Sequence, residues 1–227
     1  MKRWICLSVL ILSGVFFRKQ DTAGRKSLFM PMNRSVPDVA QKRKDWNGLI
    51  SGFKASDLVF LDESGCNTDM TRRYAYSLGG SRAVDSAPLS KPKNTTILSS
   101  IQLDGTLRYT TFSGGTTEER FKRYLETDLL PHLNGNSVLI MDNMKSHHAK
   151  AVRNLLDSSG VRCIYLPPYS PDLNPIEKLW SKVKSFLRKF KARTLDTLPN
   201  AIQCAFQTVS PSDCSGWFHS CGYSPYF

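Results

Sequence analysis

Short, wholly apolar segments that end in an acid recur along this chain. Residues 138–141 are Val, Leu, Ile and Met, and Asp142 follows them directly. Residues 58–61 show the same pattern before Asp62. A short apolar run without polar alternation is typical of a strand buried on both faces. The pattern therefore predicts two buried strands, each with a carboxylate at its C-terminal end, where sites form in open α/β sheets.

A hairpin is predicted between these two strands. The segments 94–103 and 106–112 are rich in Thr, Ile and Tyr, and Asp104-Gly105 joins them. Asp-Gly between two such segments is a strong hairpin signal, so we expect Asp104 to be a turn residue rather than a catalytic acid. Residues 63–65, Glu-Ser-Gly, are expected to form a turn after the first strand.

Helical periodicity fills most of the remaining sequence. Helices are predicted from Ser35 to about residue 50, from the capping box of Thr116 and Glu119 through Leu129, over residues 146–159, from the Asn174 cap to Phe190, and over residues 194–209. A further strand is expected at 161–166. The order strand, hairpin, helix, strand, helix, strand, helix indicates an α/β fold. Its mixed sheet is antiparallel at the hairpin and parallel where helices cross over.

The charge of the chain indicates a polyanionic partner. Among 227 residues, 31 Lys and Arg outnumber 19 Asp and Glu, which gives a net charge of +12. Such an excess suits nucleic acid or an anionic membrane surface, and the charge alone does not choose between them. The six cysteines form no C-x-x-C pair. We interpret them as reduced thiols of a cytoplasmic protein, with a zinc site at Cys214, His219 and Cys221 as the alternative.

The first residues form a separate segment. Lys2 and Arg3 precede an apolar stretch that reaches Phe17. It is too short for a transmembrane helix, and we interpret it as the remnant of a truncated upstream region, with an export signal as the alternative. We therefore divide the chain into an apolar start and linker at 1–33, one α/β domain at 34–193, and a C-terminal helix and tail at 194–227. No membrane association is expected.

Three acids on three predicted elements have the composition of a divalent-metal site. Asp62 and Asp142 end strands, and Glu177 lies in the first turn of a helix. Mg²⁺ prefers oxygen ligands, and two ions about 3.5–4 Å apart can hold the attacking and leaving oxygens of a phosphodiester in line. His147 is placed to orient a phosphate or a water nearby.

Each of these acids also has a structural alternative. Glu177 suits helix capping, Asp142 suits a turn, and Asp62 suits an ordinary strand end. Glu63 competes with Asp62, but side chains alternate along a strand, so only one of the two can face a site.

The motifs around these acids resemble one known family. They are Leu61-Asp62-Glu63-Ser64-Gly65, Met141-Asp142-Asn143 with His147, and Tyr169-Ser170-Pro171-Asp172-Leu173-Asn174-Pro175-Ile176-Glu177 with Trp180. Together they are similar to the catalytic domain of DDE transposases, in the mariner-like branch of bacterial insertion sequences. The resemblance implies a ribonuclease-H-like fold and makes Asp62, Asp142 and Glu177 the metal-binding acids. It also implies two Mg²⁺ ions, for which Mn²⁺ could substitute, with Asn143 and His147 as supporting motif residues.

The resemblance further implies Mg²⁺-dependent cleavage at transposon ends, followed by transfer of the freed 3′-hydroxyl to target DNA. Transposon-end and target DNA are the expected partners, and a homodimer is the expected active form. The candidate contacts to the DNA backbone are Arg72, Arg73, Arg82, Lys182, Lys184, Arg188 and Lys189. Residues 1–33 cannot hold the helix-turn-helix regions typical of the family. The alternative function is therefore a catalytically silent, DNA-binding remnant of a transposase.

Overall fold

The computed structural model describes residues 36–72, 77, 79, 81–86, 88 and 92–223. The apolar start, the predicted Ser35 cap and the candidate Arg73 lie outside the described residues. Within them, five strands form one sheet in the order β3-β2-β1-β4-β5. The strands are β1 (Leu58–Asn67), β2 (Asn94–Gln102), β3 (Leu107–Ser113), β4 (Val138–Met141) and β5 (Arg162–Tyr165).

The direction of the strands confirms the predicted mixed sheet. Strand β1 pairs antiparallel with β2, and β2 pairs antiparallel with β3. Strands β1, β4 and β5 are parallel to one another. Asp104 lies in the hairpin turn, where its carboxylate accepts a 2.8 Å hydrogen bond from the Thr106 amide, and Gly105 has the positive φ of 93° that the turn needs. The prediction of Asp104 as a turn residue is confirmed.

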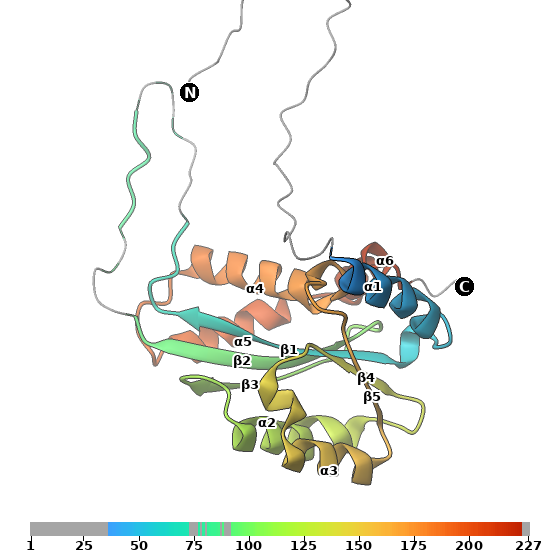
Figure 1. Cartoon of the computed structure of the whole chain (residues 1–227). Coiled ribbons are helices and arrows are strands. Elements are labelled where there is room, and N and C mark those ends of the chain that lie inside the picture. The colour runs from blue at the N-terminus through green and yellow to red at the C-terminus, as the bar shows by residue number, and fades with distance from the viewer. Residues whose placement is uncertain are drawn as a thin grey trace, which may run out of the picture.

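Helices cover both faces of the sheet (Figure 1). The α-helices are α1 (Pro37–Ile50), α2 (Glu118–Tyr124), α3 (Lys150–Ser159), α4 (Ile176–Phe190), α5 (Leu198–Gln207) and α6 (Pro211–Ser220). Short 3₁₀ or π segments are η2 (Ala55–Asp57), η3 (Leu125–Leu129), η4 (Leu130–His132), η5 (Lys145–His148) and η6 (Pro171–Leu173). No helix within the described ranges is long and apolar enough to cross a membrane.

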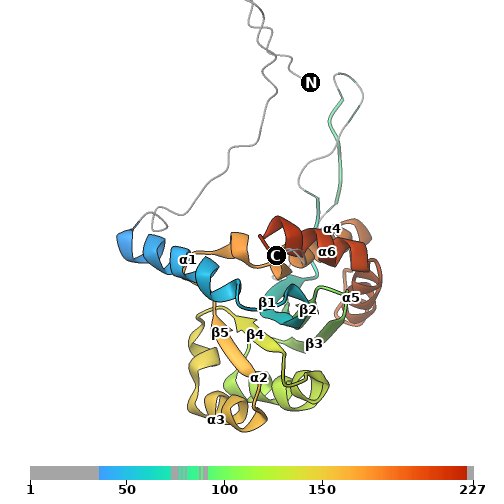
Figure 2. The same cartoon turned by 90° about the vertical axis from the view of Figure 1, so that its right-hand side faces the viewer.

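Two hydrophobic cores follow from the alternation of side chains along β1 and β4. Phe60 and Ile140 face α1, α4, α5 and α6, and Leu61 and Met141 face α2 and α3. Figure 2 shows the two helical layers on opposite sides of the sheet. Phe121, Leu125 and Leu129 recur at four-residue spacing, and all three are buried in the second core. Helices α5 and α6 belong to the first core, and the boundary proposed between residues 193 and 194 stays a prediction.

The predicted turn at 63–65 is wrong, because β1 continues to Asn67. Antiparallel pairing with β2 runs along the whole strand and ends at Asn67 opposite Asn94. This pairing outweighs the low strand propensity of Ser64 and Gly65. Asp62 is therefore not at the end of its own strand. It lies beyond the end of the shorter neighbour β4.

Helix boundaries also differ from the predictions. The predicted helix over 146–159 is interrupted at Ala149, whose backbone is extended at ψ 142°, so η5 and α3 are separate. Thr117, not Thr116, caps α2 through the Arg120 amide. The N-cap of α4 is Pro175 rather than Asn174. Helix α4 ends at Phe190 as predicted, and this residue is 47% exposed. Helix α6, capped by Ser210 and Asp213, was not predicted.

Candidate functional site

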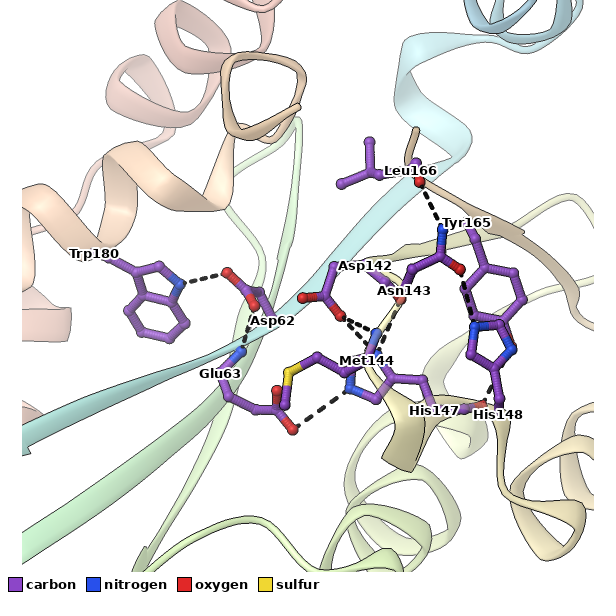
Figure 3. A network of polar contacts seen from close by, with 10 residues as sticks. All are labelled: Asp62, Glu63, Asp142, Asn143, Met144, His147, His148, Tyr165, Leu166 and Trp180. Atoms are coloured by element: carbon purple, nitrogen blue, oxygen red, sulfur yellow. Dashed lines mark hydrogen bonds and ion pairs between the residues drawn. The ribbon is translucent and has the colours of Figure 1, made fainter. Parts of the chain in front are cut away.

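The parallel pairing of β1 and β4 brings Asp62 and Asp142 to the same level. Phe60 lies opposite Ile140, and continuing that register by two residues places Asp62 beside Asp142. The two acids are 80 positions apart in sequence, yet the sheet makes them neighbours (Figure 3). The two acids meet because each directly follows an apolar run of four residues, and the two runs start at the same level of the sheet, where Leu58 pairs with Val138.

Glu177 joins them from the first turn of α4. A pocket of about 350 Å³ is lined by Asp62, Asp142, Asn143, Met144, Leu166, Pro167, Pro168, Tyr169, Ser170, Pro171, Asn174 and Glu177. The structure thus brings all three predicted acids to one pocket. Glu63 does not line it, because it faces the opposite side of β1, as strand alternation predicts.

Asp62 is the most deeply buried of the three acids, with 8% of its surface exposed. One carboxylate oxygen accepts a 3.0 Å hydrogen bond from the indole Nε1 of Trp180, and the other accepts one of 2.8 Å from the Glu63 amide. Burial raises the pKa of Asp62 to about 7, although both hydrogen bonds oppose the rise. The negative charges of Glu177 and Asp142 raise the same pKa further. A cation in the pocket would offset both the cost of burying the Asp62 charge and its repulsion by the other two carboxylates.

The pKa of Asp142 is shifted in the opposite direction to that of Asp62. Burial alone would raise its pKa, but the hydrogen bond and charge of His147 hold the pKa of Asp142 below its usual value. His147 Nδ1 lies 3.0 Å from Oδ1 of Asp142, and the Met144 amide donates to the same oxygen at 3.1 Å. The second oxygen of Asp142 points toward Asp62 in Figure 3. Asp142 therefore presents one oxygen to the pocket.

His147 is completely buried and does not line the pocket. Its ring stacks on Phe121 with 4.4 Å between the ring centroids, and Nε2 lies 3.5 Å from Oε1 of Glu63. Burial opposes the charged ring, but the hydrogen bonds to Asp142 and Glu63 raise the pKa of His147 to about 10. His147 thus acts on the pocket indirectly, by holding the Asp142 carboxylate that lines it.

Asn143 supports the loop that follows β4. Its amide Nδ2 donates to the Leu166 carbonyl at 3.2 Å, and its Oδ1 lies 2.9 Å from Nε2 of His148. The contact with Leu166 ties the end of β4 to the segment after β5, which also lines the pocket, and the contact with His148 ties it to η5.

Glu177 is solvent-exposed at the pocket rim. Burial of its carboxyl raises the pKa of Glu177, the charge of Lys184 opposes this rise, and the charge of Asp142 adds to it. Within the described ranges, no three His, Cys, Asp or Glu side chains are already close enough to hold a metal ion. The three acids thus share a pocket without forming a closed ligand cage.

The predicted DNA-contact residues are not equivalent. Arg72, Arg82 and Lys189 are exposed, and Lys184 and Arg188 are half-buried on α4. Lys182 is paired with Asp213 at 2.6 Å. Lys184 is the member of this set whose charge acts on Glu177.

Two residues of the motifs, Trp180 and Glu63, contact the site residues in a way that the sequence analysis does not predict. Trp180 lies three positions after Glu177, so one face of α4 carries both, and that spacing was a usable signal. Glu63 was considered only as a competitor of Asp62. The strand alternation that excluded it from the pocket also places it in the second core, where a carboxylate needs a partner.

A mixed five-stranded sheet between two helical layers, with carboxylates from two adjacent parallel strands and a following helix in one pocket, defines a ribonuclease-H-like fold with an acidic site. The sequence profile described as DDE superfamily endonuclease matches residues 57–199, more than half of the chain. The chain therefore belongs to the DDE endonuclease superfamily.

Individual relatives agree with this assignment. The chain is 28% identical over 97 residues to the Tc1 transposable-element transposase of Caenorhabditis elegans, across 41% of this chain and 36% of that protein. It is similar to a pre-cleavage Mos1 transpososome at a TM-score of 0.74 and 19% identity, covering 88% of this chain and 64% of that one. A Mos1 mariner paired-end complex with Mn matches at 0.73 and 19% identity, covering 88% and 63%. The chain thus spans about a third of Tc1 transposase and under two thirds of the Mos1 chains, and the placement in a bacterial branch stays a prediction.

Proposed function

We propose that this chain is the catalytic domain of a DNA transposase that hydrolyses phosphodiester bonds and transfers strands with a divalent metal. The observation that carries the proposal is the meeting of Asp62, Asp142 and Glu177 at one pocket within a DDE superfamily chain. Similar solved structures include Mos1 transposase in a paired-end complex with the left transposon end and in one with Mn, and we extend both, as a proposal, to this chain.

The residues of the pocket fit Mg²⁺ or Mn²⁺ in their chemistry. They offer carboxylate oxygens, which hard divalent cations prefer. Burial disfavours the charged Asp62, and Asp142 keeps one oxygen directed to the pocket. When bound, such ions would activate a water and stabilise the leaving oxygen of the phosphodiester. Asp62 and Asp142 would supply two ligands from the sheet, and the exposed Glu177 would supply a third from the first turn of α4.

Other residues of this chain would position the DNA. Lys184 and Arg188 lie four positions apart on α4, so they share one side of that helix near Glu177. We propose that both contact the phosphate backbone, together with Arg72, Arg82 and Lys189. Asn143 and His147 act by holding the loop and the Asp142 carboxylate. Lys182 contributes less, because Asp213 already neutralises it. The proposed active form is a homodimer that holds two DNA ends.

A nicking assay with a matched control tests this function. The full chain is incubated with supercoiled plasmid and with DNA carrying the sequences that flank its own gene, with Mg²⁺, with Mn²⁺ or with EDTA. We expect metal-dependent nicking by the wild type and by Asp157→Asn, an exposed residue of α3. Asp142→Asn is expected to abolish it. Equal activity of Asp142→Asn and the wild type would contradict the proposal.

A second candidate is a DNA-binding domain without catalysis. Two observations favour it: the net charge of +12, and the lack of a closed metal cage among the described residues. It predicts salt-sensitive DNA binding that does not change with Mg²⁺, and no cleavage in the assay above. Metal-dependent nicking that requires Asp142 would exclude it.

A further inference from the structure

Glu63 is a buried acid next to the pocket that the proposed chemistry does not use. It follows Asp62 on β1 and therefore faces the other side of the sheet, toward α2 and η5. Its side chain is 7% exposed. Moving a carboxylate into such a layer is costly unless another group compensates its charge.

The compensating group is His147. Oε1 of Glu63 lies 3.5 Å from Nε2 of His147, while Nδ1 on the other side of the same ring lies 3.0 Å from Oδ1 of Asp142. The ring is fully buried and stacks on Phe121, and these contacts restrict its rotation. One imidazole thus spans the two carboxylates, and Figure 3 shows the side chains of Glu63, His147 and Asp142 linked one after another.

The contacts within this row of side chains fix the direction of the Asp142 carboxylate. Its Oδ1 is occupied by the His147 ring and by the Met144 amide. The other oxygen is left toward Asp62. When one oxygen of a carboxylate is held by hydrogen bonds, the other oxygen points in a fixed direction. Residues that hydrogen-bond to metal ligands commonly orient them in this way.

We propose that Glu63 is a positioning residue, which fixes the His147 ring and through it the Asp142 oxygen that would bind a divalent cation. The inference rests on the proposed metal site. It assigns to Glu63 a role that a packing residue does not have, because a packing residue would affect the stability of the fold without fixing the direction of the Asp142 oxygen. The Oε2 atom of Glu63 is buried without a hydrogen-bond partner, so this acid is not optimised for stability.

Mn²⁺ binding to the full chain, measured by calorimetry or by electron paramagnetic resonance, tests the proposal without requiring activity. We expect Glu63→Gln and Glu63→Met each to raise the Kd for Mn²⁺ by about 10-fold or more. Removing one partner of a buried ion pair costs stability, so both variants are expected to unfold at a lower temperature than the wild type. The Kd values are therefore compared at a temperature where thermal unfolding shows every variant to be folded, which separates positioning from stability. Glu118→Gln, an exposed residue of α2, is the matched control and should keep the wild-type Kd.

A double-mutant cycle tests the route through His147. In His147→Asn, the amide nitrogen takes the place of Nδ1 beside Asp142, but it cannot reach Glu63. Glu63→Gln should therefore cause no further loss in the His147→Asn background. An equal loss in both backgrounds, or a wild-type Kd for Glu63→Gln, would overturn the inference while the metal site stands. A wild type that binds no Mn²⁺ would instead overturn the metal site and the inference with it.

Discussion

The indole of Trp180 donates a 3.0 Å hydrogen bond to Oδ2 of Asp62, across 118 positions of sequence. This contact joins α4 to β1 at the candidate site. Trp180 lies one turn after Glu177, so the bond also fixes the distance of the Glu177 backbone from the sheet. Two of the three acids are thereby linked through one buried side chain that is not itself an acid.

Removing that donor should destabilise the protein. Trp180→Phe keeps most of the apolar packing but leaves a buried oxygen of Asp62 without its partner. The expected loss is about 1–3 kcal/mol in the free energy of unfolding at neutral pH. It is measured by urea unfolding followed by circular dichroism. Trp217→Phe, at a partly buried tryptophan of the same core, is the control, and an equal loss in both variants would contradict a role for the hydrogen bond.

The burial of Asp62 predicts a pH dependence of stability in the absence of metal. Its folded-state pKa is about 7, above the ordinary value of 3.8, so the folded chain binds the proton more tightly than the unfolded chain. The free energy of unfolding should therefore fall as pH rises from about 4 to about 7, and the penalty is complete above that range. At about 1.4 kcal/mol per pKa unit, the upper limit is on the order of 4 kcal/mol.

Asp62→Asn should remove this dependence. The difference in unfolding free energy between the variant and the wild type is measured in EDTA at pH 5 and pH 8. It should shift in favour of the variant at the higher pH. His147 also weakens the fold as pH rises, but between about 6.5 and about 10, and its contribution is common to both proteins. A difference that does not change with pH, as expected for the control Asp157→Asn, would refute the assignment.

Much of the fold and site was predictable from local sequence. The apolar runs before Asp62 and Asp142, the Asp104-Gly105 turn and the periodicity around Glu177 each determine one element. Their order determines the mixed sheet, because hairpins pair antiparallel and helical crossovers pair parallel. The pocket follows from this topology, since the parallel pairing of β1 with β4 brings Asp62, within β1, to the level of Asp142, which directly follows β4.

The remaining features depend on contacts that are distant in sequence. Strand β1 passes through Ser64 and Gly65 because β2 pairs with it, and β2 begins 27 positions after β1 ends. The predicted helix breaks at Ala149 where His147 turns inward to Asp142 and Glu63. Neither local propensity nor hydrophobic periodicity indicates which residues distant in sequence will come into contact. The same limit explains why the roles of Glu63 and Trp180 emerged only from the structure.

Divalent metal should stabilise the folded chain. At a Mn²⁺ concentration about 100-fold above its Kd, the expected gain in unfolding free energy is about 2.7 kcal/mol. The gain should be larger at pH 8 than at pH 5.5, because Asp62 is protonated below its pKa of about 7 and a ligand must lose its proton. Thermal unfolding with Mn²⁺ or EDTA measures it. Glu177→Gln should reduce the gain and Glu118→Gln should not, and equal gains in both would argue against Glu177 as a ligand.

The guanidinium of Arg43 connects α1 to the loop that leads into α4. It forms two hydrogen bonds with Asp172, of 3.2 and 2.7 Å, and a third with Ser170, which lines the pocket. Arg43 is 16% exposed and Asp172 is 41% exposed, so solvent screens the pair only in part. A bidentate arginine contact of this kind fixes geometry as well as charge.

A double-mutant cycle measures what this contact contributes. Arg43→Met, Asp172→Asn and the double variant are compared in urea unfolding, and the expected coupling is roughly 1 kcal/mol, the upper end for pairs near the surface. The exposed pair of Lys122 and Glu126, 3.2 Å apart on neighbouring turns, is the matched control, with an expected coupling of about 0.3–0.5 kcal/mol. If Arg43 and Asp172 hold the loop in place, their coupling exceeds that of the control and persists in high salt. Additive effects of the two substitutions would show that the loop is held by its own packing.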